Sequence, residues 1–273
     1  MPSAATILVR RVAPGYEDAM LNVILHGRAT ERPPLLIVHG LFGSARNWGA
    51  VAKRLSDDRL VIVPDMRNHG SSPHLDGHSY ADLAADLAGV IRAHAEGAVD
   101  VVGHSMGGKA AMQLALTQGA LVRRMVVADI APVAYGHSQN HLIDAMEALD
   151  LSSIASRGDA DRALAAAVPD DRTRAFLLQS LDLKANPPVW RLNLPVLRRE
   201  MGSITGWPGT TGRFDGPVLF LSGALSSYMQ PEYRDPIRAL FPAAKFAKIP
   251  GAGHWLHAEK PREFEASVRV FLG

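Results

Sequence analysis

The stretch Gly103-His104-Ser105-Met106-Gly107 decides the fold class of this chain. It follows an apolar run over 99–103 and opens a helical pattern over 105–117. A Gly-x-Ser-x-Gly sequence between a strand and a helix is typical of a nucleophile elbow, a sharp turn that exposes the serine at the edge of a sheet. The helix that follows supplies free N–H groups and the positive end of its dipole. The sequence therefore predicts that Ser105 is a nucleophile, with an ordinary glycine-rich turn as the alternative.

Short apolar and β-branched runs recur on both sides of this motif. They predict strands over 6–12, 21–27, 35–39, 59–64, 99–103, 125–129, 217–222 and 245–249, and helices over 45–55, 79–94, 105–117, 232–241 and 261–272. The middle strands are almost wholly apolar, as parallel strands covered on both faces require. We therefore expect an α/β fold with an eight-stranded, mostly parallel sheet flanked by helices.

The alternation of strands and helices stops after Asp129 and resumes near residue 215. Helical patterns fill the interval over 141–149, 159–168, 172–181 and 194–204, separated by glycine and proline breakers. We expect a core made of residues 1–131 and 215–273, and a helical cap of residues 132–214 inserted after the sixth strand.

Composition excludes several classes of function. The 273 residues include 29 Lys and Arg against 27 Asp and Glu, for a net charge of +2, and no dense basic stripe points to nucleic acid. The absence of cysteine excludes disulfides, thiolate zinc sites and cysteine nucleophiles. No apolar run approaches the roughly 18–20 residues of a membrane span, and the N-terminus lacks the order of a signal peptide. We expect a cytoplasmic protein with no metal and no cofactor.

A serine nucleophile needs a general base, most often histidine. His254 lies in a glycine-rich loop after the last predicted strand, where its side chain can reach the carboxyl edge of the sheet. His257 is the alternative base, and a packing role for His254 remains open. His39 and His104 flank the glycines of their own motifs, which favours local hydrogen bonds. Three further histidines are interpreted as loop residues: His69, His74 and His78.

The third member of such a site is a carboxylate that orients the imidazole. In this architecture it usually follows the seventh strand, but the loop over 221–228 contains no acidic residue. Asp129 ends the sixth predicted strand, on the same edge of the sheet as Ser105. It is our candidate acid, with Asp215 and Asp235 as weaker alternatives and capping of the inserted segment as a non-catalytic one.

Acyl transfer also requires hydrogen-bond donors for an oxyanion. The N–H of Met106, directly after the nucleophile, is one candidate. The loop over 39–43 offers a second, for which we favour Leu41 and then Phe42; an ordinary strand-to-helix turn is the alternative. The loop over 65–72 is expected to stabilise a turn near the pocket.

These motifs together resemble the α/β-hydrolase superfamily, and within it the YbfF-type bacterial esterases and their mitochondrial abhydrolase relatives. The resemblance covers most of the chain: residues 39–44, 65–70, 103–109, 129–133, 190–193 and 250–261. It implies an eight-stranded sheet, a four-helix lid and a Ser/His/Asp triad with its acid after strand six. It also implies activity on acyl esters or thioesters, including acyl-CoA.

The cap composition is compatible with an acyl pocket. We expect Trp190, Trp207 and Tyr228 to bind the substrate. Four other apolar residues either join them or form the core of the cap: Phe176, Leu177, Leu194 and Met201. Three arginines either contact a CoA phosphate or are simply solvated: Arg191, Arg198 and Arg199. Lys109 is interpreted as a helix-surface or interface residue.

The sequence thus predicts a serine hydrolase that cleaves a small-molecule acyl ester or thioester with Ser105, His254 and Asp129. A homodimer is left open as its assembly. A small-ligand receptor on the same fold is an alternative from another class, and haloperoxidase-like or carbon–carbon bond hydrolysis are alternatives that use the same residues. The serine at position 105 argues against reactions that need an aspartate nucleophile.

Overall fold

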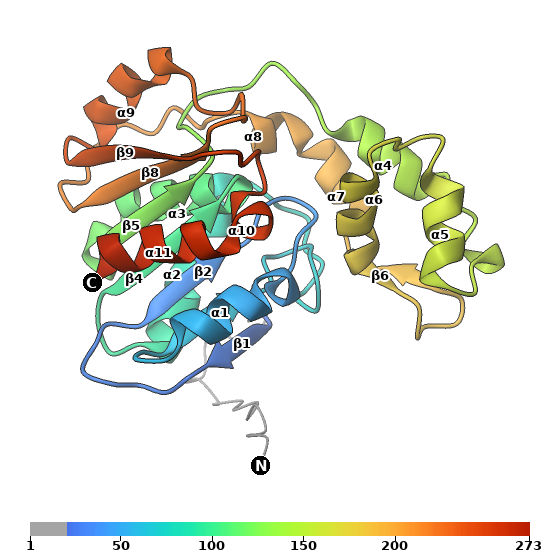
Figure 1. Cartoon of the computed structure of the whole chain (residues 1–273), viewed down its shortest axis with the longest axis horizontal. Coiled ribbons are helices and arrows are strands. Elements are labelled where there is room, and N and C mark those ends of the chain that lie inside the picture. The colour runs from blue at the N-terminus through green and yellow to red at the C-terminus, as the bar shows by residue number, and fades with distance from the viewer. Residues whose placement is uncertain (1–20) are drawn as a thin grey trace.

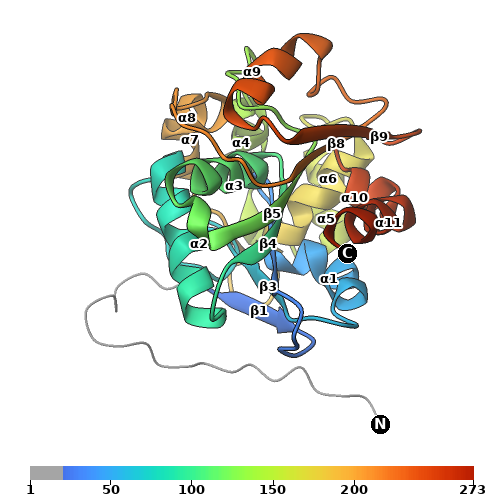
Figure 2. The same cartoon turned by 90° about the vertical axis from the view of Figure 1, so that its left-hand side faces the viewer.

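The computed structural model describes residues 21–273, so the strand expected over 6–12 lies outside the described residues. Seven strands form one sheet in the order β1-β3-β2-β4-β5-β8-β9 (Figures 1 and 2). All neighbours run parallel except β1, which pairs antiparallel with β3. The strands are β1 (Val23–His26), β2 (Leu35–Val38), β3 (Val61–Pro64), β4 (Val99–His104), β5 (Val122–Ala128), β8 (Val218–Gly223) and β9 (Ala244–Ile249). The α/β class predicted from the sequence is confirmed, with seven of the eight expected strands in the described part of the chain.

Helices cover both faces of this sheet (Figures 1 and 2). Alternate side chains of each strand enter different cores: Leu36 and Val38 pack on one face, and Leu35 and Ile37 on the other. Because both faces are buried at β2, β3 and β8, these strands are almost wholly apolar in the sequence. The first face holds α2 (Tyr80–His94), α3 (Met106–Thr117) and α9 (Arg234–Leu240), and the second holds α1 (Gly49–Leu55), α10 (Leu256–Glu259) and α11 (Pro261–Leu272).

The chain leaves the sheet after β5 and returns at β8. We call residues 132–214 the inserted segment. It contains α4 (Asn140–Glu147), α5 (Arg157–Leu164), α6 (Asp171–Leu177), β6 (Leu181–Asp182), β7 (Val189–Trp190), α7 (Leu194–Arg199) and α8 (Met201–Thr205). Helices α4 to α7 and strand β6 lie to the right in Figure 1, and α8 lies closer to the core. Across residues 21–273, none of the helices is long and apolar enough to span a bilayer.

The inserted segment differs from the expected four helices in two places. The pattern over 172–181 ends its α-helix at Leu177, and the chain then enters the antiparallel pair β6 and β7. The helix expected over 194–204 is divided at Glu200, two residues before Gly202. Glycine is a poor helix former, which favours a break at this point.

Of the two interpretations of Lys109, the solvated helix surface is wrong, because its side chain is fully buried at the contact between α3 and the inserted segment. Its ammonium group donates to the carbonyl oxygens of Val133, at 2.9 Å, and of Thr205, also at 2.9 Å, and to that of Gly206. Val133 lies at the start of the inserted segment, and the other two carbonyls belong to the last residue of α8 and to the residue after it. Three carbonyl acceptors compensate the burial of the charge, and burial lowers the pKa of Lys109 to about 7.

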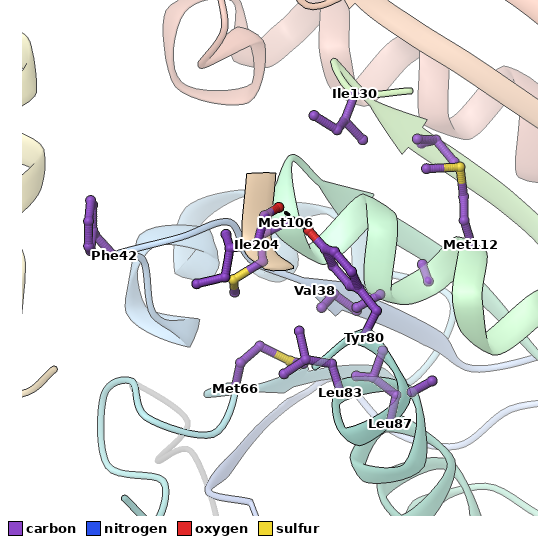
Figure 3. Close-up of a cluster of buried hydrophobic side chains, with 14 of the residues drawn as sticks. Val38, Phe42, Met66, Tyr80, Leu83, Leu87, Met106, Met112, Ile130 and Ile204 are labelled. Atoms are coloured by element: carbon purple, nitrogen blue, oxygen red, sulfur yellow. Dashed lines mark hydrogen bonds between the residues drawn. The ribbon is translucent and has the colours of Figure 1, made fainter. Parts of the chain in front are cut away.

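Tyr80 makes a second connection at the same place. Its hydroxyl donates to the carbonyl oxygen of Ile204 at 2.6 Å, and Figure 3 shows this bond beside Met106. Lys109 of α3 and Tyr80 of α2 therefore bind the start of the inserted segment and the end of α8. Both contacts lie beside Met106, the residue that follows Ser105.

Candidate active site

Ser105 lies in the sharp turn between β4 and α3. Its backbone has φ 53° and ψ −122°, a strained conformation for a residue with a side chain. Two glycines permit the turn. A Cβ on Gly103 would lie 2.5 Å from the carbonyl oxygen of Gly107, and a Cβ on Gly107 would lie 2.4 Å from those of Val38 and His39. The turn therefore packs directly on the strand ends and presents the serine hydroxyl outward.

His254 connects this hydroxyl to a carboxylate. Its Nε2 lies 3.1 Å from Ser105 Oγ, and its Nδ1 lies 2.7 Å from Asp129 Oδ2. An ionised carboxylate only accepts hydrogen bonds, so Nδ1 carries the imidazole proton and Nε2 faces the serine as an acceptor. Asp129 is completely buried, whereas the His254 side chain is 20% exposed. The structure thus brings together the three residues that the sequence singled out.

The end of β8 and the loop after it contribute donors in place of an acid. The Gly223 N–H donates to Asp129 Oδ1 at 3.1 Å, and the Ser226 hydroxyl donates to Asp129 Oδ2. With His254, these groups give the buried carboxylate three donors, as a buried charge requires. The two rival acids, Asp215 and Asp235, are both exposed, and Asp215 is paired with Arg213.

Tyr228 packs against the imidazole. Its ring stacks on His254 with a centroid distance of 4.0 Å and an interplanar angle of 20°. Its hydroxyl lies 2.9 Å from His137 Nε2, and its carbonyl oxygen accepts from the Tyr135 hydroxyl at 2.8 Å. These contacts restrict rotation of the His254 ring out of the line between Ser105 and Asp129.

The peptide between Gly40 and Leu41 has a defined direction. Met66 N–H donates to His39 Nε2 at 2.9 Å, so the His39 proton is on Nδ1, which donates to the Gly40 carbonyl oxygen at 2.8 Å. Gly43 N–H donates to the same oxygen at 3.1 Å. In a trans peptide the N–H points opposite to the carbonyl, so the Leu41 N–H is directed away from these groups. Burial lowers the pKa of His39, which keeps the imidazole neutral as this arrangement needs.

The Phe42 amide is engaged elsewhere. Its N–H donates to His69 Nε2 at 3.1 Å, and His69 Nδ1 donates to the Arg67 carbonyl oxygen at 2.9 Å. Burial lowers the pKa of His69 well below its usual value, so the ring accepts this bond as a neutral imidazole. Of the two candidate amides in this loop, Leu41 is the one left for a ligand. Met106, the first residue of α3, has no partner for its N–H within the helix.

These groups open into a cavity of about 370 Å³ between the core and the inserted segment. Its wall includes Ser105, His254, Leu41, Met106 and Tyr228. The inserted segment contributes residues from α4, from the turn before α6, from α6 itself and from the end of α8: Leu142, Val168, Phe176, Ile204 and Thr205. His257, the alternative base, also lines the cavity, but its ring stacks on Trp48 at 4.1 Å and burial lowers its pKa to about 3.

Two expected substrate-binding residues do not line this cavity. Trp190 donates its indole N–H to the Met146 carbonyl oxygen at 2.9 Å inside the inserted segment. Trp207 packs near Tyr80, with ring centroids 6.2 Å apart. Both amphipathic rings bury their apolar surface against other elements of the protein. Sequence patterns do not distinguish such packing from the wall of a pocket.

The three arginines considered for a phosphate also lie outside the cavity wall. Arg191 pairs with Asp182, Arg198 with Asp144 and Glu147, and Arg199 with Glu200. Within residues 21–273, Lys109 is the only Lys or Arg in the wall, and its bonds go to backbone carbonyls. The same part of the chain holds no group of three or more His, Asp or Glu side chains placed to bind a metal ion.

Comparison with known proteins identifies the family to which the chain belongs. The family described as "alpha/beta hydrolase fold" matches residues 33–261. The chain belongs to this α/β-hydrolase family. The sn-1-specific diacylglycerol lipase ABHD11 of Mus musculus is 39% identical over 272 residues, covering 94% of this chain and 88% of the relative. Esterase YbfF of Escherichia coli strain K12 is 38% identical over 241 residues, covering 88% of this chain and 92% of the relative.

A solved structure shows the same similarity. A marine microorganism esterase matches this hydrolase with a TM-score of 0.88 and 35% identity, covering 93% of this chain and all of that one. Together with the esterase and lipase relatives, it shows that this hydrolase is an enzyme of the esterase and lipase type.

Several side chains that shape the site were not predicted for these roles. Ser226 lay in a loop noted only for its lack of an acid, and His69 was interpreted as a loop residue. Lys109 was interpreted as a helix-surface or interface residue, although its position one helical turn after Ser105 puts it on the same side of α3 as the candidate nucleophile. That i, i+4 spacing is the one signal in the sequence that pointed to a site location for Lys109.

Proposed function

We propose that this hydrolase cleaves uncharged carboxylic esters through a covalent acyl-enzyme on Ser105. The observation that carries the proposal is the hydrogen-bonded line from Ser105 Oγ through His254 to the buried Asp129, at 3.1 and 2.7 Å, opening into a cavity between core and inserted segment. A nucleophile, a base and a carboxylate in this order match the geometry of serine hydrolases.

The reaction follows from the positions of these groups. Ser105 Oγ attacks the ester carbonyl carbon while His254 Nε2 takes the hydroxyl proton, and the Leu41 and Met106 N–H groups bind the oxyanion. The tetrahedral intermediate collapses, the bond to the leaving oxygen breaks, and His254 returns the proton to that oxygen. A water then attacks the acyl carbon with His254 again as base, and the carboxylic acid leaves as Ser105 regains its proton.

The charges around the cavity favour an uncharged leaving group over a CoA thioester. CoA carries phosphates, which proteins bind with cationic side chains. The three arginines nearest to this role are paired with carboxylates outside the wall, and the buried Lys109 is directed at carbonyls. The cleft therefore lacks the free cations, within residues 21–273, that a CoA phosphate would need.

A burst experiment tests the proposal. Mixing excess p-nitrophenyl butyrate with the enzyme should release one equivalent of nitrophenol per active site before steady turnover, because this activated ester acylates Ser105 faster than water clears the acyl-enzyme. Ser105→Ala should abolish both phases. Stoichiometric ligand retention without any burst would contradict hydrolysis and favour a receptor on this fold.

A second measurement separates esters from CoA thioesters. We expect kcat/KM for p-nitrophenyl butyrate to exceed that for butyryl-CoA, and the ratio to be unchanged by Arg198→Gln. A preference for butyryl-CoA that disappears in Arg198→Gln would instead assign the CoA phosphates to this arginine.

A further inference from the structure

The inserted segment contacts the loop that carries the Leu41 amide. The Ser180 hydroxyl donates to the Phe42 carbonyl oxygen at 2.8 Å, and the neighbouring Gln179 side chain accepts a hydrogen bond from Asn47 Nδ2. Ser180 is buried, and both residues belong to the short 3-10 helix Leu178–Ser180 that precedes β6. One turn of the inserted segment thus binds the loop at Phe42, and the 3-10 helix Ala45–Trp48 that follows the loop at Asn47.

A second contact reaches the same loop indirectly. Asn193 donates its backbone N–H to the Asn68 carbonyl oxygen at 3.0 Å and its side-chain amide to Asn68 Oδ1 at 2.9 Å. The adjacent residues, Leu192 and His69, form an isolated antiparallel β-bridge. His69 in turn accepts the Phe42 N–H. Both polar groups of Phe42 are therefore held by the inserted segment, one directly and one through His69.

Phe42 needs such support because its backbone is strained. It has φ 62°, in the left-handed region that residues with a side chain rarely adopt. A conformation of this kind persists only where the surroundings over-determine it. If the bond from Ser180 is removed, the buried Phe42 carbonyl loses its donor and the turn over 41–43 can relax. That relaxation rotates the Leu41 peptide away from the direction set by His39 and Gly43.

We propose that docking of the inserted segment assembles the oxyanion site, with Ser180 and Asn193 as positioning residues for the Leu41 amide. The proposal rests on hydrolysis at Ser105. The line of Ser105, His254 and Asp129 belongs wholly to the core, so it does not need these contacts. Only the oxyanion donor of the loop over 39–43, the Leu41 amide, depends on the inserted segment. Docking of this segment over the substrate therefore also puts the last catalytic group in place.

The test compares ground-state and transition-state binding in Ser180→Ala and Asn193→Ala. The measurements are kcat and KM for p-nitrophenyl butyrate and the inhibition constant of an alkyl trifluoromethyl ketone, whose adduct with serine carries an oxyanion. Active-site titration with a fluorophosphonate corrects for any unfolded enzyme. Ser156→Ala is the matched control, because this exposed serine caps α5 in the inserted segment and makes no contact with the loop over 39–43.

We expect kcat to fall about tenfold in each variant, a part of the roughly 10²–10³-fold loss seen when a whole oxyanion donor is removed. The inhibition constant of the ketone should rise by the same factor, with KM within about twofold of wild type, and Ser156→Ala should change none of them. A kcat and a ketone affinity within twofold of wild type would overturn the proposal. So would a loss explained by the titrated fraction of active sites.

Asn193→Ala decides the matter if Ser180→Ala does not fold, because its side chain is only partly buried. A wild-type enzyme that shows no burst and no fluorophosphonate adduct would refute hydrolysis itself. A wild-type enzyme with a full burst, beside variants of unchanged kcat, would refute only the role of the inserted segment.

Discussion

Replacing Asp129 with Asn tests the assignment of the acid most directly. The carboxylate accepts from His254 and Ser226 at Oδ2 and from the Gly223 N–H at Oδ1. An amide has one acceptor and one donor end, so it cannot satisfy all three donors. If its oxygen faces Gly223, its NH₂ faces His254 Nδ1, which must then accept. The imidazole proton moves to Nε2, and the base can no longer receive the proton of Ser105.

The size of the fall in kcat follows from comparing this orientation of the side-chain amide with the reversed one. Turning the amide places its NH₂ against the Gly223 N–H, two donors facing each other in a fully buried site. An unsatisfied buried donor costs about 1–3 kcal/mol, so the inactive orientation is favoured by about 5- to 150-fold. The variant also lacks the negative charge that stabilises the imidazolium during turnover. Together these losses correspond to a fall in kcat of about 10³–10⁴, the size known for loss of imidazole orientation in serine hydrolases.

The assay is steady-state hydrolysis of p-nitrophenyl butyrate by Asp129→Asn, with thermal unfolding to check the fold. Asp215→Asn and Asp235→Asn are the controls, because both side chains are exposed and were the rival acids in the sequence. We expect both controls to retain wild-type rates. A rate for Asp129→Asn within tenfold of wild type would show that another group orients His254.

Three further predictions concern stability. Gly107→Ala should lower the free energy of unfolding by at least about 1–3 kcal/mol, because its Cβ would lie 2.4 Å from two carbonyl oxygens; an unchanged urea midpoint would contradict the close packing of the turn. Burial lowers the pKa of Lys109 to about 7 in the folded protein. Above that pH the unfolded chain therefore carries a proton on Lys109 that the folded protein has lost. Wild-type stability should therefore rise from pH 7.5 to 9.5, by up to about 1.4 kcal/mol per pH unit from this group, and Lys109→Met should remove that contribution in urea titrations. Equal pH slopes in both proteins would show that Lys109 keeps its ordinary pKa. Burial also lowers the pKa of His78 to about 4, so the unfolded state takes up its proton first and stability falls as the pH drops from about 6.5 to 4. In thermal scans at pH 6.5, 5 and 4, the melting temperature of His78→Gln should fall less with decreasing pH than that of the wild type. An equal fall in both proteins would refute the lowered pKa of His78.

The parts of the site that could be predicted are those attached to strand ends. Ser105 and Asp129 directly follow the neighbouring strands β4 and β5, whose carboxyl ends meet at one edge of the sheet. His254 follows β9 on the same edge. Their approach depends on strand order and direction, which apolar runs and glycine-rich turns reveal over short distances in sequence.

The parts that could not be predicted depend on contacts between distant segments. Lys109 has the sequence context of a solvated helix residue, and only the carbonyls of Val133, Thr205 and Gly206 make its burial tolerable. Trp190 and Trp207 are apolar residues of the inserted segment, and their composition does not say whether they face a ligand or another element.

The sequence by itself determined the fold class, and it predicted the turn at Ser105 and Asp129 as the candidate acid, because each of these rests on a short pattern at the end of a strand. Only the tertiary structure decided which groups surround them. The bond between Ser180 and Phe42 joins residues 138 positions apart, and the bonds from Gly223 and Ser226 to Asp129 join residues more than 90 positions apart. Such pairs are selected by the packing of whole elements, so their hydrogen bonds become visible only when the segments are placed together.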